Sequence, residues 1–148
     1  MIRYPEGFRV EPVIDEYGTL EEAVRAGGNY FEIMSYAPDD ARIKSANIFP
    51  RDTLKIKAWV YPEYYDSLAV LITQTRDVSR IEKFTVDGKK ARKVWQDTDR
   101  TALGDELYSI FFVDADKKMK VIFVCYPTYT SLTEEFEKIV GSFRFTGY

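Results

Sequence analysis

"IEKFTVDGKKARKVWQ", residues 81–96, decides the fold, because it places Asp87-Gly88 between two extended runs. A two-residue type I′ turn needs positive φ at both central residues, and Asp followed by Gly accepts that geometry. The stretch therefore predicts a β-hairpin with a defined register. The opposed pairs in this register are Val86 with Lys89, Phe84 with Ala91, and Glu82 with Lys93.

The two faces of this hairpin differ in chemistry. Side chains alternate between the faces of a strand, so one face carries Phe84, Ala91 and Trp95, and we expect that face to pack against a helix. The other face is basic and is expected to lie in water. Its cations are Lys83, Lys90 and Arg92. A slip of one residue would exchange the faces, so the turn determines which side chains are buried.

A second hairpin is predicted for "LYSIFFVDADKKMKVIFVCY", residues 107–126, with its turn at residues 114–117. Its arms are apolar at both odd and even positions. Strands that are apolar on both faces are covered on both faces. We expect helices to provide this cover.

Two helices are predicted in the first half of the chain. "GTLEEAVRAGG", residues 18–28, predicts a short helix, because Thr19 and Glu22 have the spacing of a capping box and glycines follow. Residues 63–75 predict a second helix, since Pro62 suits a first-turn position and the apolar residues after it have helical spacing.

A third helix is predicted for "SLTEEFEKIVG", residues 131–141. Ser131 and Glu134 have capping-box spacing, and Gly141 supplies a stop. "SFRF", residues 142–145, is then expected to return as an edge strand.

These elements predict a single domain over residues 1–148. Further strands are expected at residues 29–36 and 53–61, and residues 38–52 are expected to form the long loop. The predicted fold class is α+β: a mainly antiparallel sheet flanked by helices on both faces, an α/β/α sandwich.

A resemblance to a known family accompanies this pattern. "YPEGFRV" near the start, a central helix, "FTVDGKKARKV", an apolar hairpin and a closing "EEFEKIVGSFRF" together resemble the PsbP and Mog1-like family of α/β/α sandwich domains, which includes bacterial lipoprotein domains. The resemblance spans most of the chain and is weakest at residues 19–26 and 38–52. It implies a non-catalytic assembly or interaction module, as PsbP is with the photosystem and Mog1 with a small GTPase.

Composition bounds the class of protein. Of 148 residues, 45% are hydrophobic and 30% charged, which is typical of a soluble globular domain. The longest apolar runs are strand-sized, far short of the roughly 20 residues that a membrane-spanning helix needs. Only two Gln, two Asn and one Cys accompany this charge content, a trend of proteins from hot environments.

The start of the sequence leaves the compartment open. "MIRYPEGF" lacks the basic region and apolar stretch of a signal peptide. A natural start at Met1 would imply the cytoplasm, whereas a lipoprotein signal upstream would place the domain on an extracytoplasmic membrane face.

The residue inventory argues against familiar catalysis. Histidine is absent, which removes Ser-His-Asp and Cys-His chemistry and His-ligated zinc, and one cysteine cannot form a thiolate metal site. We expect no enzymatic activity, no cofactor and no metal. Asp97 and Asp99 stand at the first two ligand positions of a calcium loop, but Ala102 replaces the turning glycine and Tyr108 the bidentate glutamate, so a solvated loop is the favoured interpretation.

Two surfaces remain as binding candidates. The basic face suits an acidic protein partner or the anionic head groups of a peripheral membrane contact, with an ordinary solvated face as the alternative. The net charge of −3 supplies no global field for nucleic acid. The second candidate is a cluster of tyrosines that follow two of the predicted strands. If those two strands run in the same direction, the tyrosines would gather along one edge of the sheet. The members of this cluster are Tyr61, Tyr64, Tyr65, Tyr126 and Tyr129.

The sequence thus predicts a non-catalytic binding or accessory domain with a protein partner. The alternative is a small-molecule-binding α+β domain, either a carrier or an enzyme that works without histidine. A third interpretation is an oligomerising domain that uses "SFRF" as its exposed edge. The oligomeric state itself stays open.

Overall fold

The computed structural model describes residues 7–37, except 13–28, and residues 39–144, except 47–48 and 98–105. Within these residues one antiparallel sheet has the strand order β1-β2-β3-β7-β6-β5-β4. The strands are β1 (Arg9–Pro12), β2 (Asn29–Met34), β3 (Lys55–Pro62), β4 (Val78–Val86), β5 (Lys89–Asp97), β6 (Glu106–Asp114) and β7 (Met119–Tyr126). The strands at residues 29–36 and 53–61 and both hairpins are therefore confirmed.

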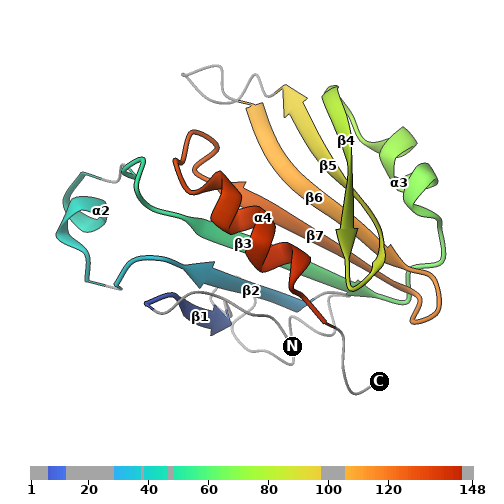
Figure 1. Ribbon diagram of the computed structural model, residues 1–148, viewed down its shortest axis with the longest axis horizontal. Coiled ribbons are helices and arrows are strands. Elements are labelled where there is room, and N and C mark those ends of the chain that lie inside the picture. The colour runs from blue at the N-terminus through green and yellow to red at the C-terminus, as the bar shows by residue number, and fades with distance from the viewer. Residues whose placement is uncertain (1–6, 13–28, 38, 47–48, 98–105, 145–148) are drawn as a thin grey trace.

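The prediction of an α/β/α sandwich is wrong. The helices in the described part of the chain are α2 (Ala41–Ala46), α3 (Leu68–Gln74) and α4 (Thr133–Gly141), of six, seven and nine residues. Figure 1 shows α4 crossing one face of the sheet and α3 lying beside β4, β5 and β6. Single short helices do not form layers, and the fold is mainly β.

The error has a physical cause. Two-faced burial was predicted correctly: on β6 both Phe111 and its neighbour Phe112 are buried. Burial shows that a strand is covered, but not what covers it. Here side chains outside the helices contribute, because Phe143 stacks on Phe31 of β2 and packs edge-on against Phe123 of β7.

The register of the β4–β5 hairpin is the one that its turn predicts. Val86 lies opposite Lys89, and the opposition continues to Glu82 with Lys93. Asp87 and Gly88 have φ angles of 53° and 71°, the positive values of a type I′ turn. This local geometry sets the side-chain directions from the turn to the pair of Arg80 with Trp95, beyond which a bulge between Val78 and Arg80 shifts the register.

The sheet has a different core on each face. On the α4 face, Phe136, Ile139 and Val140 of α4 pack with buried residues of β3, β5, β6 and β7. On the α3 face, Leu71 packs with Val94 and Phe111. The second cluster is smaller, so one short helix is enough to cover it.

Several helix boundaries differ from the prediction. The helix expected over residues 63–75 begins only at Leu68, because Pro62 completes β3, Glu63 has a positive φ of 58°, and the Ser67 side chain caps the helix. The helix expected at residues 18–28 lies outside the described residues. The expected loop at residues 38–52 contains α2.

The C-terminal predictions also need correction. Ser131 does not cap α4: its hydroxyl donates to the carbonyl of Arg51, and the N-cap residue is Leu132 without a side-chain bond. Gly141 ends α4 within the right-handed region, and Ser142 follows it in the same region. Residues 142–144 form no strand. None of the described helices is long and apolar enough to cross a bilayer.

Candidate functional site

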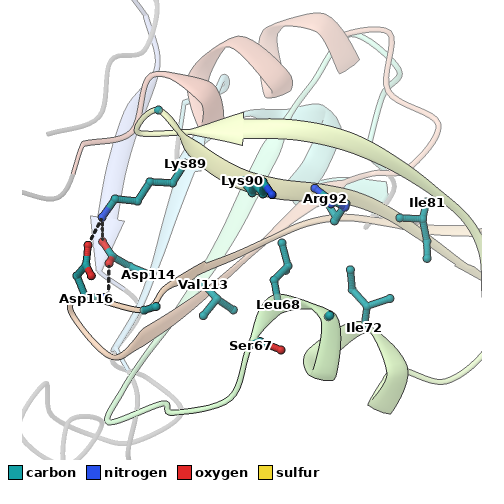
Figure 2. A pocket seen from close by; sticks show the side chains of 13 residues that line it. Ser67, Leu68, Ile72, Ile81, Lys89, Lys90, Arg92, Val113, Asp114 and Asp116 are labelled. Carbon is teal, nitrogen blue, oxygen red and sulfur yellow. Dashed lines mark hydrogen bonds and ion pairs between the residues drawn. The ribbon is translucent and has the colours of Figure 1, made fainter.

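A groove with a volume of about 850 Å³ lies between α3 and the β4–β5 hairpin. In Figure 2, Leu68 and Ile72 of α3 point toward the hairpin, and Lys90 and Arg92 of β5 lie on the other side. Val113 of β6 lies between the two walls. The groove therefore has an apolar wall and a cationic wall.

The cationic wall follows from the register of the hairpin. Lys90 and Arg92 are two residues apart on β5, share a face and line the groove, and Lys83 of β4 lies directly opposite Arg92 on the same face, beyond the groove lining. Lys83 and Lys90 are exposed, as predicted for this face, whereas Arg92, also expected to lie in water, is half-buried. The Arg92 guanidinium donates to the carbonyl of Ala91 at 2.8 Å. None of these three cations has a carboxylate partner among the described residues.

The opposite face of the same hairpin behaves differently. Its cations all have carboxylate partners: Arg80 pairs with Glu82 at 2.7 Å, Lys89 with Asp114 at 2.8 Å, and Lys93 with Glu137. The hairpin thus separates its cations by face. Arg80, Lys89 and Lys93 are neutralised, although Lys89 also reaches one end of the groove, whereas Lys83, Lys90 and Arg92 are available.

The apolar wall depends on where α3 begins. The Ser67 hydroxyl accepts from the Val70 backbone N–H at 3.1 Å and starts the helix. Leu71 is then directed into the sheet, while Leu68 and Ile72, four residues apart, reach the groove. Ile81, 46% exposed, adds an apolar side chain from β4.

One end of the groove is an ion pair. The Asp114 carboxylate has no exposed surface and accepts from Lys89 and from the backbone N–H groups of Asp116 and Lys117. Burial acts to raise the pKa of the Asp114 carboxyl, but the bonds from Lys89 and the Lys117 N–H outweigh it and lower that pKa. The bond to Asp114 raises the pKa of Lys89. Lys89 is therefore already neutralised and does not belong to the available cations.

The predicted tyrosine cluster is not formed. It required two strands that run in the same direction, but β3 and β7 are antiparallel, so Tyr61 and Tyr126 lie at opposite ends of the pair. At one end, Lys120 lies 4.5 Å from the ring of Tyr61 and 4.6 Å from that of Tyr64. Tyr65 is 73% exposed, with Lys118 over its ring at 5.4 Å.

The other two tyrosines belong to a separate cluster. Lys57 lies 4.5 Å over the ring of Tyr126, which packs edge-on against Phe49. Burial lowers the pKa of Lys57, and Lys55 beside it adds to the effect. The Tyr129 hydroxyl donates to the carbonyl of Phe49 at 2.7 Å. These contacts hold the loop before β3 onto the sheet.

The calcium-loop candidate at Asp97 and Asp99 receives no further support. Asp97 is exposed at the end of β5, and Asp99 lies outside the described residues. Within the part of the chain that the structure describes, no three Cys, Asp or Glu side chains gather as metal ligands would.

The sequence predicted the cationic wall of the groove but not the apolar wall. The cations followed from the Asp87-Gly88 turn, which is local. The apolar wall needed the position of α3 over β5 and β6, for which the sequence carries no local signal. Asp114 accepts from backbone N–H groups of its own turn, and its pairing with Lys89 joins residues 25 apart, which no local pattern could predict.

The chain was compared with family models, with curated proteins and with solved structures, and none of these comparisons gave a match. The resemblance to PsbP and Mog1-like domains stays a prediction.

Proposed function

We propose that the protein is a non-catalytic binding module that holds a protein partner in the groove between α3 and the β4–β5 hairpin. The observation that carries this proposal is the set of available cations. Lys83, Lys90 and Arg92 share one face and have no carboxylate partner in the part of the chain that the structure describes, although every cation on the other face of the hairpin has one. A partner that supplies carboxylates would complete the pattern.

Charge alone would not distinguish this face from an ordinary solvated surface. The apolar wall makes the difference, because Leu68 and Ile72 lie across from the cations in one hollow, with Ile81 beside Arg92 on the hairpin side. Interfaces bury apolar side chains and use charge mainly for specificity and rate of association. A groove with both components suits a partner surface that is acidic and partly apolar.

A small molecule is the second candidate. The groove volume of about 850 Å³ lies within the range of roughly 300–1,000 Å³ that small-molecule sites occupy. The same chemistry would favour a ligand that carries a carboxylate on an apolar body. Stabilisation of the protein by such a compound in a thermal-shift screen would support this candidate.

The proposed function can be tested by site-specific photo-cross-linking in a lysate of the source organism. A benzophenone amino acid replaces Ile81 at the groove rim, in the wild type, in Lys83→Glu/Lys90→Glu/Arg92→Glu (the triple-Glu variant), and in Lys138→Glu. Lys138 is exposed on α4 across the sheet, so its reversal is the matched charge control. Captured proteins are identified by mass spectrometry.

The expected result is a defined protein captured by the wild type and by Lys138→Glu, and lost with the triple-Glu variant. Capture of the same protein by all three forms would overturn the role of the groove. Turnover of a metabolite by the purified protein would contradict the non-catalytic assignment.

A further inference from the structure

We infer that the segment bound in the groove is an extended stretch of the partner in which carboxylate side chains alternate with apolar ones. The inference rests on the proposed function and adds the conformation and residue pattern of the occupant. Its basis is the matching geometry of two opposite walls.

The cationic wall has the repeat of a β-strand. Lys90 and Arg92 are two residues apart on β5, so their Cα atoms are about 6.8 Å apart. Lys83, directly opposite Arg92, widens this row by one strand. Carboxylates spaced about 6.8 Å apart along a segment parallel to β5 would meet successive cations.

The apolar wall has nearly the same repeat. Leu68 and Ile72 are four residues apart on α3, which separates them by about 6 Å along the helix axis. Both walls therefore offer contacts at intervals close to the two-residue repeat of an extended chain.

The walls lie on opposite sides of the groove (Figure 2). An extended chain directs successive side chains to opposite sides. One side can carry carboxylates toward Lys90 and Arg92, and the other can carry apolar groups toward Leu68 and Ile72. A segment in which carboxylate and apolar side chains alternate can therefore contact both walls at once.

The Asp114 end of the groove limits where carboxylates can lie. Asp114 is fully buried and Asp116 lies beside the same ammonium group, with its carboxylate 3.8 Å from Lys89. Both are acidic and would repel a further carboxylate. The acidic positions of the occupant are thereby restricted to the part of the groove beside Lys90 and Arg92.

Titration of the ¹⁵N-labelled protein with end-capped synthetic peptides, followed by amide chemical shifts, tests this inference. The probes are EVEVEVEV, the same residues in block order (EEEEVVVV), KVKVKVKV, and a helix-forming peptide with Glu and Leu stripes on opposite faces. Chemical shifts report both the affinity and the place of binding. The proteins are the wild type, Lys90→Glu/Arg92→Glu, Ile81→Ser and Lys138→Glu.

We expect EVEVEVEV to shift amides of α3 and β5 and to bind about fivefold or more tighter than EEEEVVVV, the equivalent of about one ion-pair contact. KVKVKVKV should not bind. Lys90→Glu/Arg92→Glu should bind EVEVEVEV at least about tenfold more weakly, Ile81→Ser should bind it more weakly, and Lys138→Glu should bind it as the wild type does.

Equal binding of the alternating and block peptides would overturn the alternation, and tighter binding of the helical peptide would overturn the extended conformation. If no acidic peptide binds, but cross-linking still captures a partner that depends on the cations, this inference fails and the proposed function stands. If neither binding nor cation-dependent capture occurs, both fail.

Discussion

The ammonium group of Lys89 lies 2.8 Å from a carboxylate oxygen of Asp114, whose side chain is completely buried where β6 ends. Lys90, the next residue, points to the opposite face and has no carboxylate partner within the described residues. Two adjacent lysines therefore have different roles. One joins the two hairpins, and the other is available to a ligand.

Replacement of Asp114 should lower stability in two steps. Asp114→Asn removes the charge but keeps an oxygen for the backbone N–H groups of Asp116 and Lys117, and we expect a cost of about 1–2 kcal/mol. Asp114→Ala also leaves those N–H groups without their acceptor and should cost about 1–2 kcal/mol more. Urea denaturation of the two variants and the wild type measures both steps. Equal stability of the two variants would contradict the role of the turn contacts.

The contribution of Asp114 should depend on pH. Its pKa is lowered in the folded state, so the carboxylate stabilises the protein fully above the unfolded pKa of about 3.9 and loses this effect as pH falls through the lower folded value. The difference in unfolding free energy between the wild type and Asp114→Asn should therefore be constant near neutral pH and shrink below about pH 4. A difference that grows on acidification would show the opposite linkage.

Two glycines should respond differently to alanine. Gly88 has a φ of +71°, so Gly88→Ala should destabilise the protein by about 1–2 kcal/mol although nothing lies within 4 Å of the new methyl group. Gly141 ends α4 without positive φ, and a methyl group there would lie 3.4 Å from the ring of Phe84. Gly141→Ala should stay within about 0.5 kcal/mol of the wild type. The denaturation midpoints of the two variants and the wild type measure the stability lost in each. Similar losses in both variants would contradict the assignment of backbone strain to Gly88.

Cys125 should be unreactive in the folded protein. The side chain is fully buried on β7, and burial, with a smaller effect from Glu137, raises the pKa of its thiol to about 12. The thiolate is the reactive form, so labelling with a thiol reagent at pH 7.5 should be slow in buffer and complete in guanidinium chloride. Rapid stoichiometric labelling of the native protein would contradict this burial.

The exposed lysines of the basic face should be dispensable for folding. Within the described residues Lys83 and Lys90 have no carboxylate partner, so Lys83→Glu and Lys90→Glu should each cost no more than about 0.5 kcal/mol. Lys93→Glu, on the other face of β5, breaks the pair with Glu137, which also accepts from Tyr108, and should cost more than either of those changes. Thermal unfolding followed by circular dichroism ranks the variants. If Lys83→Glu or Lys90→Glu were less stable than Lys93→Glu, that lysine would have a structural role.

The turn at Asp87-Gly88 explains why one half of the candidate site could be predicted. The dihedral preference of two adjacent residues set the register of β4 and β5, and with it the faces of Phe84 and Lys90. The apolar residues at both odd and even positions of β6 and β7 likewise predicted burial on both faces. These inferences needed only neighbours in the chain.

The apolar wall of the candidate site depends on segments that are far apart in the sequence. The tyrosines lie apart because β3 and β7 run in opposite directions. The helical layers are absent from the described residues because short helices and side chains such as Phe143 cover the sheet instead. The helix that forms the apolar wall begins at Leu68 because Ser67 caps it there and Pro62 still belongs to β3.

The sequence by itself determined the two hairpins, the register of the first, and the face on which each of its cations lies, because backbone dihedral preferences and side-chain alternation act over a few residues. Only the tertiary structure decided which of those cations are neutralised and that an apolar wall lies across from the rest. Ion pairs and groove walls form between segments that folding brings together. Lys89 and Asp114, for example, are 25 residues apart, and no local conformational preference specifies a contact between them.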